Sequence, residues 1–188
     1  MRAFALRTFL MACIMLGALG LVALSPAPEE FQARLLGRDS HPGMRATKFI
    51  ISIDGYTSPE EVYELAKTLS DNGYEAFMAA FRAITKGYIR PIGGRGIKVN
   101  FHAAHSLPTE KGRKIMLFTQ RQSWDPEAQQ RTDQRFTFMV IELNLDKKGK
   151  GDGKIYEQAN IRLTGQGTVE MESYNAAPLQ LWGVSPRK

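Results

Sequence analysis

The spacing of apolar residues along this chain of 188 residues changes at Gly87, and that change constrains the fold most strongly. Between Ser58 and Gly87, apolar residues recur with the period of a helix, as Val62, Leu65 and Leu69 do. After Gly87, apolar and polar residues alternate, which is the two-residue period of a strand. Helices followed by a run of strands predict an α+β domain with an antiparallel sheet.

Two helices are predicted before the change of period. Ser58 can cap the first helix, and Glu61 stands where it completes a capping box. The first helix is expected to end at Gly73, because glycine readily adopts a positive φ. A second helix starts near Tyr74 and stops before Gly87, and its apolar stripe is expected to pack in the core: Phe77, Met78, Phe81 and Ile84.

One strand is predicted before the helices, at 48–53, where β-branched residues are frequent. The part after Gly87 predicts a mostly antiparallel sheet of about seven strands, ending in a four-strand meander. These strands are expected at 88–92, 97–103, 113–121, 136–145, 154–163, 168–174 and 178–184.

The register of the meander can be derived from its apolar residues, because a slip of one residue would turn a strand's apolar set outward. We pair Leu145 with Lys154 across the first turn. A three-residue loop at 165–167 then places Arg162 opposite Glu170, a favourable cross-strand pair. With a similar loop before the last strand, one apolar face is predicted to shelter beneath the helices, and it includes Phe138, Ile161, Met171 and Leu181.

The first 28 residues have the layout of an export signal. Arg2 and Arg7 precede an apolar run, and small and Pro-rich residues follow it. The run fits either a cleaved signal or an uncleaved anchor, since its length is at the short limit for a spanning helix. Cys13 lies in this segment and is the single cysteine of the chain, so cleavage would leave a mature chain without cysteine.

Three segments are therefore predicted along the chain. They are a signal peptide or N-terminal anchor at 1–28, a tether at 29–44 that could include a short helix, and a single α+β domain at 45–188. The protein is expected to be exported to the periplasm or the extracellular space, and to stay tethered to the membrane if the leader is not cleaved.

The positive charge of the chain is unevenly distributed. The formal net charge is +6, and it falls to +4 without Arg2 and Arg7. Acidic residues gather at 54–75 and basic residues at 86–121. Such asymmetry can attract anionic lipid headgroups or an acidic glycan, and no feature indicates a specific nucleic acid. The alternative is an ordinary solvated surface, and the oligomeric state stays open.

Several stretches in the second half of the chain are shared with a known family. On these stretches the chain resembles a family of small exported bacterial proteins of unknown function, known mainly as hypothetical proteins. The resemblance implies export and a single domain, and it supplies no catalytic residue. The stretches are Gly87-Tyr88-Ile89-Arg90, Gly112-Arg113-Lys114-Ile115, Phe136-Thr137, Ile141-Glu142-Leu143, Gly149-Lys150-Gly151-Asp152-Gly153-Lys154, Glu172-Ser173-Tyr174 and Pro178-Leu179-Gln180-Leu181.

Glu142 and Glu157 are the catalytic candidates. The register above places them directly opposite each other, where two close carboxylates disfavour joint ionisation. Such a pair can act as acid and base, or bind a cation, unless this end of the hairpin is solvated. His102 and His105 do not predict a metal site, because residues three apart on a strand point to opposite faces. No metal or cofactor is predicted.

A long polar loop and the basic strand region form the predicted binding site. Trp124, in the loop, can stack on a sugar ring, with Arg121 and Arg131 beside it, or can simply anchor the loop. Lys98 and His102 are predicted to share the polar face of a neighbouring strand.

The leading hypothesis for function is a noncatalytic, exported binding or interaction domain of the cell envelope that recognises an anionic surface or glycan. One alternative is a small hydrolase or isomerase that uses Glu142 and Glu157. Another alternative is a carrier that holds an apolar ligand between the sheet and the helix pair.

Overall fold

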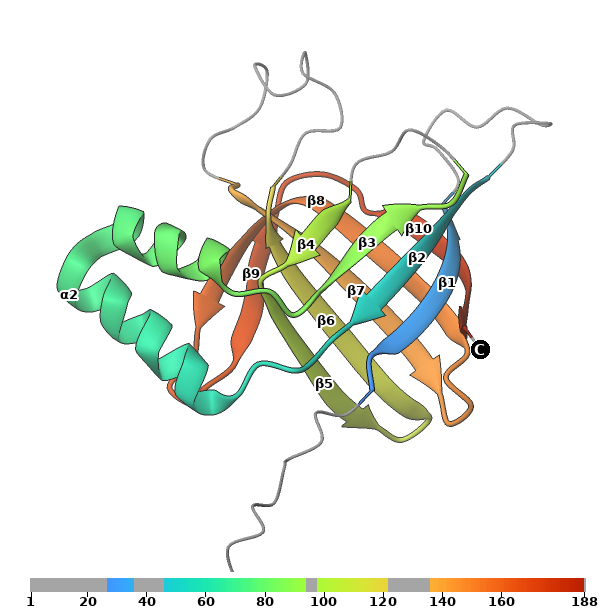
Figure 1. Cartoon of the computed structure of the whole chain (residues 1–188), viewed down its shortest axis with the longest axis horizontal. Helices are drawn as coiled ribbons and strands as arrows, with labels where there is room; N and C mark the ends of the chain where they lie inside the picture. Colours follow the sequence, from blue (N-terminus) through green and yellow to red (C-terminus); the bar gives the residue numbers. More distant parts are fainter. Residues whose placement is uncertain (1–26, 36–45, 94–97, 122–135, 188) are drawn as a thin grey trace, which may run out of the picture.

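The computed structural model describes residues 27–35, 46–93, 98–121 and 136–187, so the predicted signal segment lies almost wholly outside the described residues. Within these ranges the protein is an α+β structure with one helical element and a ten-stranded antiparallel sheet (Figure 1). The elements are β1 (Glu29–Leu35), β2 (Thr47–Ile53), α2 (Pro59–Ala83), β3 (Gly87–Pro91), β4 (Val99–Phe101), β5 (Ala103–Thr109), β6 (Gly112–Gln120), β7 (Phe138–Asp146), β8 (Gly151–Leu163), β9 (Val169–Tyr174) and β10 (Leu179–Pro186).

The sheet curls until its two ends meet in one bent segment of chain. Its order is β4-β3-β2-β1-β10-β8-β7-β6-β5, and β9 pairs with β8 beside this path. Only His102 separates the end strands β4 and β5, so β3 and β6 pair with two halves of the same segment. At the bend, the His102 N–H donates to the Phe118 carbonyl of β6 at 2.8 Å. Closure therefore pairs strands that an open sheet would leave at its edges.

Alternate residues of the strands fill the inside of the closed sheet. Along β7, Met139, Ile141, Leu143 and Leu145 point inward, and each is at most 3% exposed. Each of the nine strands on the closed path contributes to this interior core. The two-residue period predicted from the sequence thus produces a packed interior.

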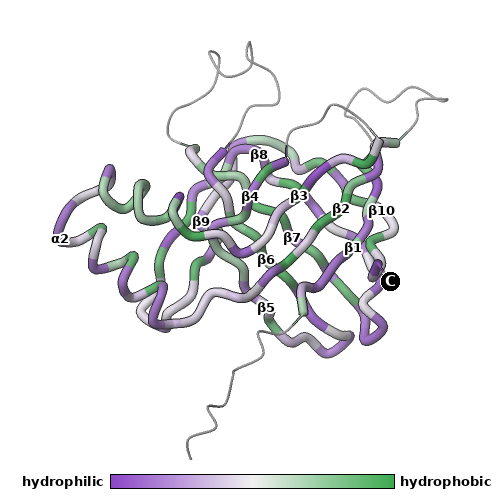
Figure 2. The backbone as a smooth tube through the Cα atoms, in the orientation of Figure 1, coloured by the Kyte–Doolittle hydropathy of each residue, from purple (hydrophilic) through white to green (hydrophobic). Residues whose placement is uncertain are grey.

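A second core lies outside the sheet, where α2 and β9 cover the outer face of β5 to β8. Phe81 of α2 meets Phe138 of β7 edge-on, with ring centroids 5.6 Å apart. In Figure 2, α2 alternates between hydrophilic and hydrophobic residues, as expected for a helix with one covered side. In the described structure this cover is confined to one side, and the strands β1, β2, β3 and β10 carry no helix (Figure 1).

The helical element α2 begins as the sequence predicts and breaks where a break is predicted. Ser58 Oγ accepts the Glu61 N–H at 3.3 Å, and the Glu61 carboxylate accepts the Ser58 N–H at 2.8 Å, which completes the capping box. Gly73 has a φ of 81°, a positive value that favours glycine. The two predicted helices are the two arms of α2 on either side of Gly73 (Figure 1).

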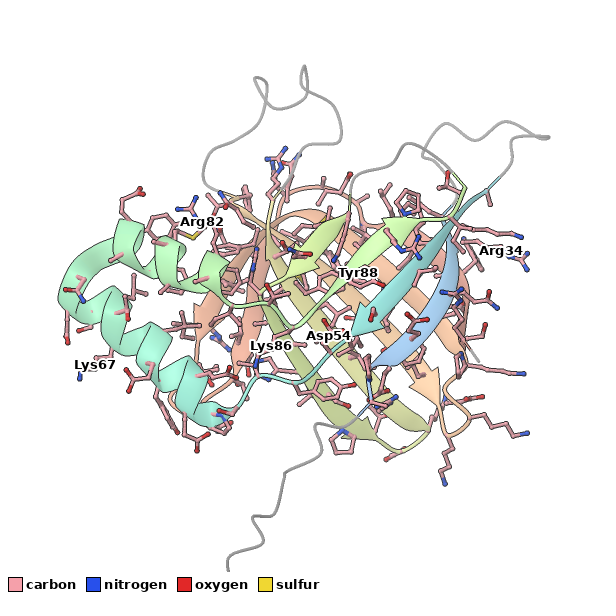
Figure 3. All side chains as sticks on the ribbon, in the orientation of Figure 1. Arg34, Asp54, Lys67, Arg82, Lys86 and Tyr88 are labelled. Atoms are coloured by element: carbon pink, nitrogen blue, oxygen red, sulfur yellow. The ribbon has the colours of Figure 1, made fainter. Side chains whose placement is uncertain are left out.

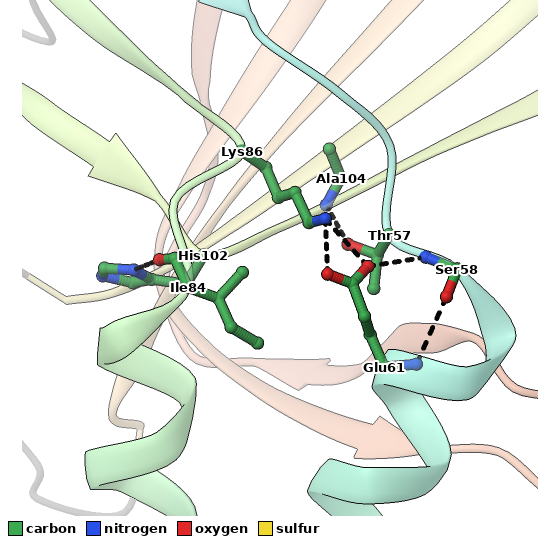
Figure 4. Close-up of polar contacts among 7 residues, drawn as sticks. All are labelled: Thr57, Ser58, Glu61, Ile84, Lys86, His102 and Ala104. Carbon is green, nitrogen blue, oxygen red and sulfur yellow. Dashed lines mark hydrogen bonds and ion pairs between the residues drawn. The ribbon is translucent and has the colours of Figure 1, made fainter. Parts of the chain in front are cut away.

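Polar contacts attach the start of α2 to the sheet (Figure 4). The Lys86 ammonium, just before β3, lies 2.6 Å from the Glu61 carboxylate. Burial raises the pKa of Glu61, but the hydrogen bond and positive charge of Lys86, together with the Ser58 N–H, outweigh burial and leave this pKa below its ordinary value. The Thr57 N–H donates to the Ala104 carbonyl (2.8 Å), and Thr57 Oγ1 accepts the Ala104 N–H (2.9 Å). These bonds set where α2 starts relative to β5.

The prediction of a tether at 29–44 is wrong for its first residues. Residues Glu29–Leu35 form β1, which pairs with β2 on one side and β10 on the other. Phe31 and Ala33 point into the interior core, while Gln32 and Arg34 are exposed. This alternation is the signal of a strand. The rest of the predicted tether, 36–45, lies outside the described residues.

The predicted register of the meander is confirmed in one hairpin and wrong in another. Between β8 and β9, Arg162 stands opposite Glu170, and their side chains form an ion pair at 2.8 Å. Between β7 and β8, Leu145 pairs with Gly151 instead of Lys154. The turn is shorter than predicted, because the Asp146 carboxylate accepts the N–H groups of Lys148 (2.8 Å) and Lys150 (2.9 Å).

The last strand is also placed differently from the prediction. β10 pairs with the first part of β8 and with β1, whereas β9 pairs with the last part of β8. The 13 residues of β8 are long enough to serve both partners in succession. Consequently Leu181 lies in the interior core, while Phe138, Ile161 and Met171 belong to or pack against the outer core. The predicted single apolar face is wrong for Leu181.

Candidate binding surface on the sheet

The structure does not bring the predicted binding residues together in its described part. Trp124 and Arg131 lie outside the described residues. Arg121 follows β6, where burial lowers its pKa and the nearby Glu157 carboxylate acts in the opposite direction. Lys98 is exposed just before β4, and its ammonium lies 4.2 Å from the centre of the Tyr88 ring.

The prediction that His102 lies on a polar face is wrong. His102 is 8% exposed, and its Nδ1 lies 2.7 Å from the Ile84 carbonyl, to which it donates (Figure 4). The edge of its ring meets Phe81, and burial lowers its pKa. The bend between β4 and β5 falls at this residue, so the alternation that begins with Lys98 and Asn100 does not continue through it.

The predicted pairing of Glu142 with Glu157 is wrong as well. Glu142 stands opposite Lys154 in the observed register. Its carboxylate accepts a hydrogen bond from Asn144 Nδ2 (2.7 Å) and lies 3.6 Å from the Lys114 ammonium. The two carboxylates therefore do not form a directly opposed acid–base pair.

Cations gather instead on the outer face of the strands that α2 does not cover. Arg34 of β1 is directly opposite Lys48 of β2, and Arg90 of β3 is opposite Ile50, two residues farther along β2. Figure 3 shows Arg34 and Tyr88 on this side of the sheet. We call this surface the basic face, and we define it by Gln32, Arg34, Lys48, Tyr88, Arg90, Lys98 and Trp182.

The three strand cations of the basic face repel one another. Like charges directly opposite on neighbouring strands are destabilising, and Arg34 and Lys48 have this arrangement. Among the described contacts, none of Arg34, Lys48 and Arg90 forms an ion pair. The nearby carboxylates are engaged elsewhere, Glu30 by Arg187 at 3.2 Å and Asp54 by the Ser52 hydroxyl at 3.2 Å. As far as the described residues go, the face therefore presents positive charge without an acidic partner to solvent.

An exposed aromatic side chain extends the basic face. Trp182 of β10 is opposite Arg34 on β1, and it is 51% exposed. A tryptophan ring in this position offers a flat apolar surface with a polar N–H beside a cation. Of this group the predicted site included Lys98 alone, because the other members come from four different strands. The alternation of Phe31 and Ala33 with Gln32 and Arg34 was the available signal.

Arg113 shows what a compensated cation looks like in the same molecule. Its guanidinium binds both carboxylate oxygens of Glu29 at one end of the closed sheet, and Tyr56 Oη donates to Glu29 at 3.1 Å. Arg113 holds the pKa of Glu29 below its usual range, and burial together with Glu29 raises the pKa of Tyr56 to about 12. Tyr56 packs against the interior core beside this ion pair, and the charges of Glu29 and Arg113 already satisfy each other.

Comparison of the chain with protein-family models, with curated proteins and with solved structures gave no match. Within the described ranges, no group of three His, Cys, Asp or Glu side chains is arranged to hold a metal ion. In the same ranges, no helix is long and apolar enough to span a membrane.

Proposed function

We propose that the protein is an exported, noncatalytic binding domain of the cell envelope that attaches to an acidic glycan through its basic face. The observation that carries this proposal is the direct opposition of Arg34 and Lys48, with Arg90 close by and no acidic partner in the described contacts. Such an arrangement costs folding stability. A bound polyanion would offset the repulsion between these cations.

The dimensions of the basic face suit an extended ligand. The strands β10, β1, β2 and β3 are adjacent in the sheet, so three strand spacings separate the outer two. At about 4.8 Å per spacing, Trp182 and Arg90 lie on strands roughly 14 Å apart. A chain of several sugar units that crosses the strands could contact Trp182, Arg34, Lys48 and Arg90 in turn.

The exposed tryptophan favours a glycan over a lipid surface. Trp182 lies on the face of a sheet rather than at a protruding tip, so its ring can stack on a sugar but is poorly placed to enter a bilayer. Export is supported by the basic and then apolar first 28 residues of the sequence.

The two alternative functions receive less support from the geometry. The hypothesis of a carboxylate-dependent enzyme depended on Glu142 lying directly opposite Glu157. The residue opposite Glu142 is Lys154 instead. The space predicted to hold an apolar ligand, between α2 and the sheet, is occupied by buried side chains that include Phe77, Phe81 and Val140.

Binding to polygalacturonate, measured by biolayer interferometry, tests the proposal. We expect binding at about 20 mM salt that weakens strongly by about 500 mM, because exposed charges are screened over a Debye length. The variant Arg34→Gln/Lys48→Gln/Arg90→Gln should bind about tenfold more weakly, since each exposed charge contributes up to about 1 kcal/mol. Neutral dextran should not bind.

A matched control removes three positive charges elsewhere. Lys111, Lys147 and Lys148 are exposed at the tips of two hairpins, so Lys111→Gln/Lys147→Gln/Lys148→Gln changes the net charge equally. This variant should keep most of its affinity. Equal weakening of both variants, or stronger binding to phosphatidylglycerol vesicles than to polygalacturonate, would contradict the assignment of the basic face to a glycan.

A further inference from the structure

A cleft of about 390 Å³ lies on the other side of the closed sheet, at the margin of the outer core. Its volume falls within the usual range of small-molecule sites, about 300–1,000 Å³. Its walls combine apolar side chains with a few polar groups, which include His105, Leu107, Lys114, Met116, Glu142 and Met171. None of these residues belongs to the basic face, so the cleft is independent of the proposed glycan site.

The register explains why a cleft forms here. Outward residues of β5, β6, β7 and β8 line up in rows across the sheet. The row closest to α2 is buried, and it consists of Ala103, Phe118, Val140 and Tyr156. The row farthest from α2 is largely exposed, and it consists of Leu107, Lys114, Asn144 and Asp152. The row between them, at the limit of the cover, consists of His105, Met116, Glu142 and Lys154.

The hairpin of β8 and β9 forms the other wall of the cleft. The Val169 N–H donates to His105 Nε2 at 3.0 Å, which holds the start of β9 against β5. The tip of the hairpin is attached to α2, because the Tyr63 hydroxyl donates to the Gly165 carbonyl at 3.3 Å. The walls are thus fixed to each other before any ligand binds, which reduces the entropic cost of binding.

Two opposite charges lie side by side in this cleft. The Lys114 ammonium is 3.6 Å from a Glu142 carboxylate oxygen, which is too long for a hydrogen bond. The Glu142 side chain is 12% exposed, while the Lys114 side chain is 38% exposed. The other carboxylate oxygen of Glu142 is held by Asn144 Nδ2 at 2.7 Å. The pair therefore keeps hydrogen-bonding capacity for a further partner, next to the thioethers of Met116 and Met171.

We propose that the cleft binds a small zwitterion with an apolar side chain, of the class of leucine and phenylalanine. The ligand carboxylate would pair with Lys114, the ligand ammonium would pair with Glu142, and the side chain would lie against Leu107, Met116 and Met171. A ligand that carries one charge would meet one favourable and one repulsive group. A dipolar head satisfies both groups at once.

Calorimetric titration of the purified protein with L-leucine and L-phenylalanine tests the proposal. The matched probes are 4-methylpentanoate, which lacks the ammonium of leucine, and 3-methylbutylamine, which lacks its carboxylate. We expect saturable binding of leucine or phenylalanine below about 1 mM. Each probe with a single charge should bind at least about tenfold more weakly, because it leaves one charge in the cleft unpaired.

Variants of the cleft give a second, independent readout. Glu142→Gln and Lys114→Met should each weaken amino-acid binding about tenfold or more. Lys111→Met is the matched control, since it removes the same charge from an exposed hairpin tip and Lys111 does not line the cleft. Equal binding of the single-charge probes, unchanged affinity of both cleft variants, or no binding of either amino acid would overturn the proposal. If a cleft variant fails to fold, the probe series on the unaltered protein still decides.

Discussion

The two sides of the closed sheet share one interior core and differ in what lies outside it. On the covered side, the outward residues Phe118, Val140 and Ala159 are fully buried beneath α2 and β9. The outer faces of β1, β2, β3 and β10 carry no helix, and we call them the bare side. There the outward residues Arg34 and Arg90 are exposed. Strand pairing is continuous through both sides. The covered side therefore adds a second core. On the bare side Ile50 is buried, but Arg34 and Lys48 stand opposite each other as charges that repel.

The largest expected effect comes from removing a ring on the covered side. Phe81→Ala should lower the free energy of unfolding by about 3–5 kcal/mol, because Phe81 is 0% exposed and contacts Phe77, His102 and Phe138. On the bare side, Trp182→Ala should cost less than about 1 kcal/mol, since half of that side chain is already in water. Urea denaturation followed by circular dichroism measures both values. Similar losses for the two variants would remove the distinction between the sides.

A smaller effect should appear when the covered side is acidified. Burial lowers the pKa values of His102 and His105 from 6.5, so below pH 6.5 the unfolded chain binds more protons than the folded chain. The free energy of unfolding should therefore fall as the pH drops from 7 to about 5.5. His105 contributes directly, because a protonated ring cannot accept the Val169 N–H, and the loss of a buried hydrogen bond costs about 1–3 kcal/mol.

The control for this pH dependence keeps an acceptor at position 105 without a titrating ring. His105→Gln should show a smaller fall in the urea midpoint between pH 7 and about 5.5 than the unaltered protein. The pKa of Glu29 is lowered mainly by Arg113, so this carboxylate stays ionised between pH 7 and about 5.5 and does not contribute to the change in stability. A pH dependence that is identical in the two proteins would show that His105 does not hold β9 through its neutral form.

Local signals predicted much of the fold, and they failed where distant contacts decide. The capping box at Ser58, the break at Gly73 and the cross-strand pair of Arg162 with Glu170 depend on residues close in sequence, and all three are confirmed. The partners of β10 depend on closure of the sheet. β10 pairs with β8, which is near it in sequence, and with β1, which lies at the other end of the described chain. A hydrophobic pattern sets which face of a strand is buried, but it does not name the strand's partner.

The candidate site was harder to predict than the fold for the same reason. The sequence singled out Lys98 and the basic region around it, but Arg34 stood in a segment interpreted as a tether, and Trp182 lies in the last strand. Sheet order brings Arg34, Lys48 and Trp182 side by side. The error over Glu142 and Glu157 came from the length of a single turn, which Asp146 shortens through its bonds to Lys148 and Lys150.

The smallest expected change in stability has the opposite sign and belongs to the bare side. Lys48→Glu places a carboxylate directly opposite Arg34, so a repulsive cross-strand pair becomes an attractive one. We expect the free energy of unfolding to rise by about 0.2–1 kcal/mol. Affinity for polygalacturonate should fall in the same variant, because the charge that stabilises the sheet also neutralises the proposed site.

Lys67→Glu is the matched control for this last change, since Lys67 is an exposed residue of α2 far from the basic face in Figure 3. It makes the same change of net charge, and it should leave glycan binding nearly unaltered. We expect Lys48→Glu alone to gain stability and lose binding. That result would indicate that the cations of the bare side bind a ligand although their repulsion destabilises the fold. A loss of stability in Lys48→Glu would instead show that the opposed cations are not strained, and it would remove the main physical reason for assigning a ligand to this face.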